Sequence, residues 1–325
     1  MKTTTILTLA AAGAFAATAA WAQLDLDFDA ISATGQALFD RFASDEMKEK
    51  YEIASGDQMR SMAQTYLNAF ASENLGEVAA LREMAAAYVS REQASGISTV
   101  LGEWLQLHTA DFTVATVLHR QAQQRAQQPK TGTSVTGTPA KPAAPESATA
   151  VGLYKQQYGT KSPSERAQKW SPQVRQVFIR EGVPEELIWQ AEVESSWNPS
   201  ARSPVGAVGL FQFMAPTARE MGLKTENPDE RLDALLNAGA AARYLRQLYG
   251  RFHDWKLVLA AYNCGGGRVN KLRRESGKGD AATFDDIYSR LPSETKLYVP
   301  KIDALVQLRT GKSLDGLGGC DFKAR

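Results

Sequence analysis

Apolar residues recur at helical spacing along the first half of the chain, between Ile31 and Arg125. Residues 23–128 contain no proline and few runs of β-branched residues. This pattern predicts three to five helices, packed as a bundle or as an array of helical hairpins. The two histidines of this half, His108 and His119, are too far apart for a metal pair on one helix face and are interpreted as ordinary helix residues.

The second half of the chain is also predicted to be helical. A helical pattern begins at Ser171 and runs through Glu181, where a glycine closes it. Residues 237–249 and 255–262 carry the clearest further helical patterns, and turns that contain Gly and Pro separate them. Alternating runs of β-branched residues, which indicate strands, are missing from the sequence. A mostly helical domain with long loops is therefore predicted.

A segment rich in Pro, Thr, Ala and Gly, without aromatic residues, separates the two halves at residues 129–150. It has no hydrophobic period and cannot bury enough apolar surface to order itself, so we predict a flexible linker. The predicted organisation is a helical accessory domain at 23–128, this linker, and a second domain at 151–325. Docking to a protein partner and a stabilising or spacing role are both compatible with the accessory domain.

The overall composition excludes several classes of protein. Hydrophobic residues make up 43% and charged residues 22% of the 325 residues, which rules out a wholly disordered, collagen-like or membrane-embedded chain. The 37 basic and 36 acidic residues nearly balance, so nucleic acid is not expected as the main partner. The net charge is −7 over residues 23–128 and +6 over residues 151–325. Two units of opposite sign are expected to have different partners or to face each other.

The first 22 residues have the pattern of a signal peptide. Lys2 supplies the positive charge, residues 6–20 form an Ala-rich apolar stretch, and Ala-Trp-Ala at residues 20–22 is a cleavage site. We expect export and cleavage before Gln23. No cysteine follows the apolar stretch, so a lipid anchor is not expected there. No later stretch is long and apolar enough to span a bilayer.

The strongest candidate for chemistry lies in residues 184–196. Pro184 followed by two acidic residues is typical of a helix start. The buried stripe that 100° per residue predicts consists of Leu187, Ile188 and Ala191. Glu194 lies at the edge of this stripe, whereas Glu192, about 200° away around the helix, is expected to face water. Burial raises the pKa of a carboxyl group and favours a general acid. The alternative is a glutamate whose carboxylate is satisfied by backbone donors.

Four sequence blocks extend from this helix toward the C-terminal region. They are E-S-S-W-N-P at 194–199, S-P-V-G-A-V-G-L-F-Q-F-M at 203–214, A-Y-N-C-G at 261–265 and L-P-S-E-T-K-L-Y-V at 291–299. Their order and spacing resemble those of the lytic transglycosylases of bacterial cell walls, specifically the soluble lytic transglycosylase-type catalytic domain. The resemblance spans about residues 165–312. It implies a lysozyme-like fold of the α+β superfamily, similar to goose-type lysozyme, that is mostly α with a cleft between helical lobes.

This resemblance implies an enzyme that cleaves peptidoglycan strands at the β-1,4 bond between N-acetylmuramic acid and N-acetylglucosamine. The cleavage is non-hydrolytic and leaves a 1,6-anhydro-muramyl end. Glu194 matches the family's single catalytic acid, which acts first as general acid and then as general base, and no metal or cofactor is implied. The matches to positions that line the glycan cleft are Ser203, Gln212, Met214, Tyr262, Asn263, Glu294 and Tyr298. With the predicted signal peptide, the resemblance implies a periplasmic protein.

Several of these positions also have structural interpretations. Gln212 and Asn263 are typical of buried amides that hold loops together. Tyr262 is compatible with core packing, and Met214 with filling a gap in the core. The neighbouring aromatic residues that are interpreted as core are Trp197, Phe211 and Phe213. The residue types alone leave both interpretations open.

The two cysteines are Cys264 and Cys320. Cys264 occupies a position where the family commonly has a small residue. In an oxidising compartment the two cysteines are candidates for a disulfide that would hold the C-terminal tail beside the cleft. Two free thiols explain the same pattern, so both alternatives stay open.

Two other functions are compatible with the same residues. A lysozyme-type hydrolase would keep the site but let water complete the reaction and leave a reducing end. A non-catalytic cell-wall-binding or assembly protein would use the second domain only to hold glycan, with the N-terminal helices as the functional part. The glutamate at the position of the catalytic acid argues against this last alternative.

Overall fold

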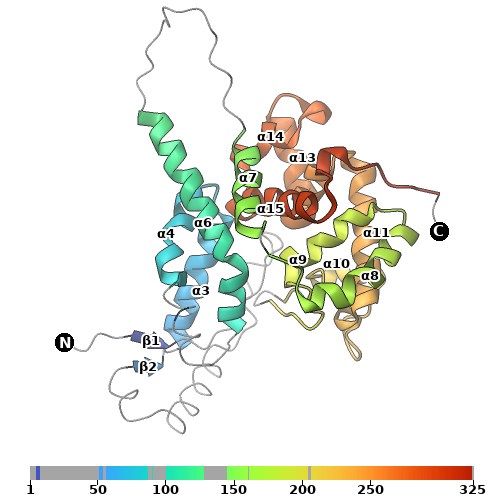
Figure 1. Ribbon diagram of the computed structural model, residues 1–325, viewed down its shortest axis with the longest axis horizontal. Coiled ribbons are helices and arrows are strands. Elements are labelled where there is room, and N and C mark those ends of the chain that lie inside the picture. Colours follow the sequence, from blue (N-terminus) through green and yellow to red (C-terminus); the bar gives the residue numbers. More distant parts are fainter. Residues whose placement is uncertain are drawn as a thin grey trace, which may run out of the picture.

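Helices form most of the regular structure in the described part of the chain, so the mostly α class is confirmed (Figure 1). The computed structural model describes residues 5–7, 51–53, 56–86, 90, 100–127, 145–159, 161–203 and 206–323. The predicted signal peptide, except residues 5–7, lies outside the described residues, as do linker residues 129–144. The final predicted linker residues, 146–150, are described and begin a helix instead.

Three helices make up most of the described N-terminal part (Figure 1). They are α3 (Gly56–Ala71), α4 (Leu75–Ala80) and α6 (Val100–Gln127). Buried apolar side chains from all three form one cluster, with Phe70, Val78 and Phe112 each at most 2% exposed. The helical pattern predicted for this half is found in these residues. A short parallel pair of strands, β1 (Thr5–Leu7) and β2 (Tyr51–Ile53), accompanies them; three-residue strands are too short for a period to reveal.

The second half is built from helices of very different length. From the linker to the candidate site they are α7 (Glu146–Tyr158), α8 (Glu165–Arg180), the 3-10 helix η1 (Glu185–Trp189) and α9 (Gln190–Ser195). Beyond it come α10 (Ala215–Glu220), η2 (Glu230–Leu232), α11 (Ala234–Phe252), α12 (Trp255–Cys264), α13 (Gly266–Glu275), η3 (Gly279–Ala281), α14 (Phe284–Ile287), η4 (Tyr288–Arg290), α15 (Ser293–Thr310) and η5 (Leu314–Gly316).

Helix α8 begins earlier than the sequence pattern predicts, at Glu165 instead of Ser171. The reason is a side-chain cap, because the Ser164 hydroxyl accepts a hydrogen bond from the backbone N–H of Ala167 at 3.2 Å. Pro172 therefore lies inside the helix. The proline lacks an N–H for the carbonyl of Gln168, four residues earlier, and because Gln168 is exposed this carbonyl can bind water instead. The sequence pattern instead predicted a helix that starts at Ser171, directly before this proline.

The two helices predicted most clearly are confirmed and are slightly longer than their patterns. Helix α11 begins where the Asp233 carboxylate accepts from two backbone N–H groups, each at 2.9 Å. Helix α12 begins in the same way at Asp254, which accepts from the Leu257 N–H at 2.9 Å. Together they supply much of the larger core, in which Leu245 and Leu259 are fully buried.

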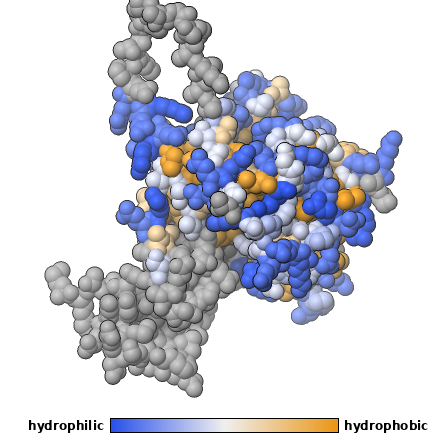
Figure 2. All heavy atoms as spheres, viewed as in Figure 1, coloured by the Kyte–Doolittle hydropathy of each residue, from blue (hydrophilic) through white to orange (hydrophobic). Residues whose placement is uncertain are grey.

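Helix α15 is the central element of the molecule (Figure 1). Apart from Glu294, every residue from Ser293 to Val306 is buried, which is expected only of a helix that is packed on all sides. One side contributes Leu297 and Ala304 to the N-terminal apolar cluster, and another side belongs to the larger core. Helices that precede the linker and helices that follow it therefore both pack against α15. On the face in view hydrophilic residues dominate, with apolar residues concentrated near the middle (Figure 2).

Candidate active site

Glu194 lies near the end of α9, in the short stretch where a 3-10 helix continues into an α-helix. Pro184 precedes this stretch, as predicted from the sequence. The predicted buried stripe is confirmed, because Leu187, Ile188 and Ala191 are each 0% exposed. Glu194 itself is 8% exposed. The helix pattern thus correctly predicted a carboxyl group at the edge of an apolar face.

The prediction for the neighbouring acid, Glu192, is wrong. Its side chain is only 17% exposed and forms an ion pair with Arg309 of α15 at 3.3 Å. Helix α9 has only six residues. Helix α15 covers the side of α9 that the helical period assigns to water. Glu192 therefore joins α9 to α15 instead of pointing into solvent.

Two polar side chains contact the Glu194 carboxylate. The Tyr298 hydroxyl, from α15, donates a short hydrogen bond to Oε1. The Gln190 amide nitrogen lies 3.4 Å from the same oxygen and donates to the Tyr298 hydroxyl at 2.9 Å. Burial raises the pKa of Glu194 to about 7, although these hydrogen bonds favour the ionised form and oppose the rise. Near neutral pH the group therefore exchanges a proton readily.

The turn after α9 fixes the position of this carboxyl group. The backbone is left-handed at Ser196 (φ 49°) and Trp197 (φ 60°), and the Trp197 N–H returns to the carbonyl of Ala191 at 3.2 Å. The indole of Trp197 is fully buried, so this strained turn is held by packing. The Ser195 hydroxyl donates to the carbonyl of Leu210 at 2.8 Å and so connects α9 to the next loop.

The predicted residues of that loop mainly hold it together. The Ser203 hydroxyl accepts from the Ala207 N–H at 2.8 Å, and the Gln212 amide donates to the carbonyl of Gly209 at 2.7 Å. Gln212 itself has a left-handed backbone (φ 49°). Met214 is half-buried at the start of α10. Both the loop-holding interpretation of Gln212 and its place next to the site are consistent with this geometry.

Close backbone approach explains why a glycine is needed within this loop. Gly209 has φ +90°, and an added Cβ would overlap the carbonyl oxygen of Arg231 and the amide of Asn237. Asn237, from α11, accepts from the Phe211 N–H at 2.8 Å and donates to the Arg231 carbonyl at 2.9 Å. This fully buried amide was not among the predicted site residues, although it positions the loop. Its only sequence signal is a polar residue on the apolar face of α11.

The remaining predicted residues lie on α12 and α15. The Tyr262 hydroxyl donates to the carbonyl of Phe211 at 2.9 Å, and burial, followed by the nearby Glu194, raises its pKa well above the usual value. The Asn263 amide donates to Glu294 Oε1 at 2.8 Å and accepts from the Thr295 hydroxyl at 2.6 Å. Tyr298 is therefore the predicted residue that contacts Glu194 directly, whereas Asn263 and Glu294 form a neighbouring pair.

Both cysteines are free thiols in the structure, so the disulfide considered from the sequence is not formed. Their surroundings differ. Cys264 is buried at the end of α12, where the Thr295 hydroxyl contacts its sulfur and burial raises its pKa to about 11. Cys320 is half-buried in the C-terminal tail, near Arg246 and Tyr249 of α11. The tail is held instead by backbone bonds such as Asp321 N–H to the carbonyl of Gly182, at 2.8 Å.

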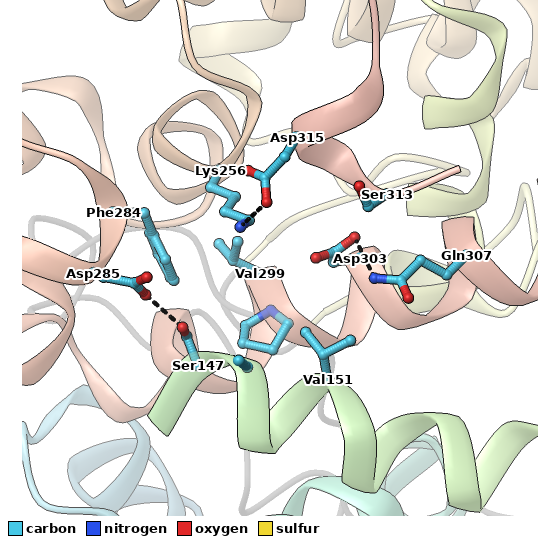
Figure 3. Close-up of a pocket in the computed structure, with 12 residues that line it drawn as sticks. Ser147, Val151, Lys256, Phe284, Asp285, Val299, Asp303, Gln307, Ser313 and Asp315 are labelled. Carbon is cyan, nitrogen blue, oxygen red and sulfur yellow. Dashed lines mark hydrogen bonds and ion pairs between the residues drawn. The ribbon is translucent and has the colours of Figure 1, made fainter. Parts of the chain in front are cut away.

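A pocket of about 210 Å³ lies apart from these residues, where α7, α12, α14 and α15 meet η5 (Figure 3). Among the residues that line it, Lys256 and Asp315 form an ion pair at 2.6 Å, and the Ser147 hydroxyl donates to Asp285. None of the site residues predicted from the sequence lines this pocket. The pocket lies where α7 packs against the other helices of the second half.

Among the residues that the structure describes, no cluster of three or more His, Cys, Asp or Glu side chains is arranged to bind a metal ion. None of the helices in the same residues combines the length and the apolar character that a bilayer crossing requires.

The fold and the site together define a helical protein with a buried, protonatable glutamate, Glu194, that a tyrosine from another helix holds in place. Residues 179–284 match the family model described as the transglycosylase SLT domain. This region is similar to lytic murein transglycosylases. The family resemblance noted in the sequence is thereby confirmed.

Named relatives agree with this assignment. The membrane-bound lytic murein transglycosylase D of Escherichia coli (strain K12) is 40% identical over 129 residues, which are 39% of this chain and 28% of that protein. The soluble lytic murein transglycosylase of Salmonella typhimurium (strain LT2) is 38% identical over 119 residues, 34% of this chain and 18% of that protein. The chain thus spans less than a third of these relatives.

Among solved structures, the chain is similar to the 70 kDa soluble lytic transglycosylase from Escherichia coli. The TM-score is 0.38 and the sequence identity 18%, over 90% of this chain and 58% of that chain.

Proposed function

We propose that this protein cleaves the glycan strands of peptidoglycan as a lytic transglycosylase. The observation that carries the proposal is Glu194, a buried carboxyl group with a pKa of about 7 that accepts a hydrogen bond from Tyr298. It lies within the region that matches the transglycosylase SLT domain. A group with this pKa is suited to give and to take back a proton near neutral pH.

In the proposed reaction Glu194 first acts as general acid and protonates the glycosidic oxygen between N-acetylmuramic acid and N-acetylglucosamine. The bond from this oxygen to C1 of N-acetylmuramic acid breaks, and N-acetylglucosamine leaves with the proton. The 2-acetamido group of the substrate stabilises the cationic centre, which makes a second enzymatic carboxylate unnecessary. Glu194, now ionised, takes the proton of the C6 hydroxyl as that oxygen bonds to C1. The product is a 1,6-anhydro-muramyl end. The hydrogen bonds from Tyr298 and Gln190 support the ionised form between the two steps.

We assign the other predicted residues to the walls of a glycan-binding cleft around Glu194. Tyr262 and Tyr298 approach the acid from α12 and α15. Asn263 and Glu294 form a polar pair beside them at 2.8 Å. The loop residues that complete this set are Ser203, Gln212 and Met214. Their internal hydrogen bonds give the loop a fixed shape, which favours binding of a rigid sugar chain.

We further propose that the protein works in the periplasm after removal of residues 1–22. The support is the signal-peptide pattern of the sequence and the relatives named as murein transglycosylases. The proposed organisation keeps an accessory helical unit at 23–128 and a catalytic unit at 151–325. A role in docking a protein partner remains a proposal for the accessory unit.

Mass spectrometry of products from purified peptidoglycan tests this function. The wild-type protein is expected to release anhydro-muropeptides, and Glu194→Gln is expected to release none while it remains folded. Products one water heavier, with reducing ends, would instead establish a lysozyme-type hydrolase. Glu220→Gln, which removes an exposed carboxylate of α10, is the matched control and is expected to retain activity. Binding of glycan without any product from the wild type would favour the non-catalytic alternative.

A further inference from the structure

Helix α15 has two functional faces. Glu294 and Tyr298, one turn apart, meet the candidate site through Asn263 and Glu194. The residues that contact the N-terminal part of the chain are Ser293, Lys296, Leu297, Lys301 and Ala304. At about 100° per residue these five lie on one continuous face, next to the face that carries Tyr298. The helix that positions the candidate catalytic group is therefore held by the N-terminal helices.

The strongest of these contacts is a buried ion pair between α15 and α6. Lys301 Nζ lies 3.0 Å from Asp111 Oδ2 and donates to the carbonyl of Leu107, also at 3.0 Å. The two side chains are only 2% and 5% exposed. A charge buried to this degree is stable only when an opposite charge and hydrogen bonds compensate it. The buried charge of Lys301 is thus compensated by Asp111, which precedes the linker in the chain.

Asp111 is in turn the meeting point of three helices. His108 Nδ1, on α6, lies 2.6 Å from Oδ2, and the Tyr154 hydroxyl, on α7, donates to Oδ1 at 2.6 Å. An ionised carboxylate only accepts, so the His108 nitrogen is the donor. Burial alone would raise the pKa of Asp111, but Lys301 and the two donors lower it to about 2. The same pairing keeps the pKa of Lys301 above its usual value despite burial.

Lys301 also connects this network to the site. It follows Tyr298 by three residues on α15, so a shift of the helix at Lys301 would move the hydroxyl that contacts Glu194. Its charge favours the ionised form of Glu194. The titratable groups around Glu194 are Tyr298 and Lys301 from α15, Tyr262 from α12 and Glu192 on its own helix. Around Lys301 they are Asp111 and His108 from α6, and Tyr154 and Tyr158 from α7.

We propose that Asp111 and Lys301 are positioning residues that make the N-terminal helices a structural part of the catalytic centre. They act through α15, by holding the Tyr298 hydroxyl on the Glu194 carboxylate. This inference rests on the proposed catalytic role of Glu194. It identifies α15 of the same chain as a binding partner of the N-terminal helices, in addition to any external partner.

The test uses the full chain and a readout that does not depend on activity. Glutamate labelled with ¹³C at the side-chain carboxyl allows the pKa of Glu194 to be measured by NMR, and Glu194→Gln identifies its signal. The double variant Asp111→Leu/Lys301→Met removes both buried charges, a change that buried pairs often tolerate without loss of stability. Asp111→Asn keeps the shape of the side chain but removes its charge. Lys256→Met is the matched control, because it breaks the ion pair with Asp315 at 2.6 Å, away from Glu194.

The double variant is expected to remain folded, to raise the pKa of Glu194 and to lower the rate of glycan cleavage about tenfold or more. Asp111→Asn is expected to raise the same pKa as well, because burial favours the neutral form of Lys301 once its carboxylate partner is removed, and a neutral Lys301 no longer supports ionised Glu194. The control is expected to keep both wild-type values. A folded double variant with wild-type pKa and rate would overturn the inference; if that variant unfolds, an unchanged pKa in Asp111→Asn would do so. If the variants show these pKa shifts but the wild type forms no product, the proposed function alone would be refuted.

Discussion

Replacing Glu194 by Gln should stabilise the protein in a strongly pH-dependent way. Burial raises the pKa of Glu194 from 4.5 to about 7. At 1.36 kcal/mol per pKa unit, this rise corresponds to about 3 kcal/mol of free energy of unfolding. Because the folded-state pKa is the higher one, the contribution is fully present below pH 4.5 and is lost as the pH rises through 7. Glutamine has the same shape, still accepts from Tyr298 and does not titrate in this range.

The free energies of unfolding of the wild type and of Glu194→Gln should therefore diverge as the pH rises. Urea unfolding well below pH 4.5 and well above pH 7 measures this difference, which is expected to grow by about 3 kcal/mol in favour of the variant. Glu220→Gln is the control, since a surface substitution of this kind stays within about 0.5 kcal/mol. If the stability difference is the same at both pH values, Glu194 is not a buried group with a raised pKa. This conclusion does not depend on the activity of the protein.

Three further changes test how the site is held. Tyr298→Phe removes the hydroxyl that favours ionised Glu194, so an NMR titration should show a pKa above 7, and an unchanged pKa would contradict the contact. Gly209→Ala combines φ +90° with an overlap on the Arg231 carbonyl and should cost more than about 1 kcal/mol in urea unfolding; a neutral result would exclude the close approach. Trp197→Ala empties a fully buried position and should cost about 3–5 kcal/mol in the same assay, with a loss below 1 kcal/mol as the contrary outcome.

Local pattern was sufficient to find Glu194 but not the group that controls it. The apolar stripe of Leu187, Ile188 and Ala191 placed the acid at a buried edge, and the structure agrees. Gln190 could have been noticed, because a residue four positions before the acid shares its face of the helix. Tyr298 lies 104 residues farther along the chain. Its place was anticipated only through the family resemblance, which matched it to a position that lines the glycan cleft.

The error at Glu192 shows the limit of the helical period. Periodicity tells which side chains share a face, but whether that face meets water depends on what packs against it. Arg309 and α15 cover the side that was assigned to solvent. His108 is a similar case, because a histidine interpreted as an ordinary helix residue is 8% exposed and donates to Asp111.

The sequence by itself determined the mostly helical class, the main helices of the second half, the resemblance to lytic transglycosylases and the place of Glu194 at a buried edge. These features depend on residues close together in the chain, through the 3.6-residue period, caps such as Asp233 and short ordered motifs. The tertiary structure decided how the two halves meet. The sequence showed that they carry opposite net charge but offered no partner for Lys301, because its carboxylate, Asp111, lies 190 residues away. Folding moves these two charges out of water together. Because both are buried, each one would destabilise the protein without the other.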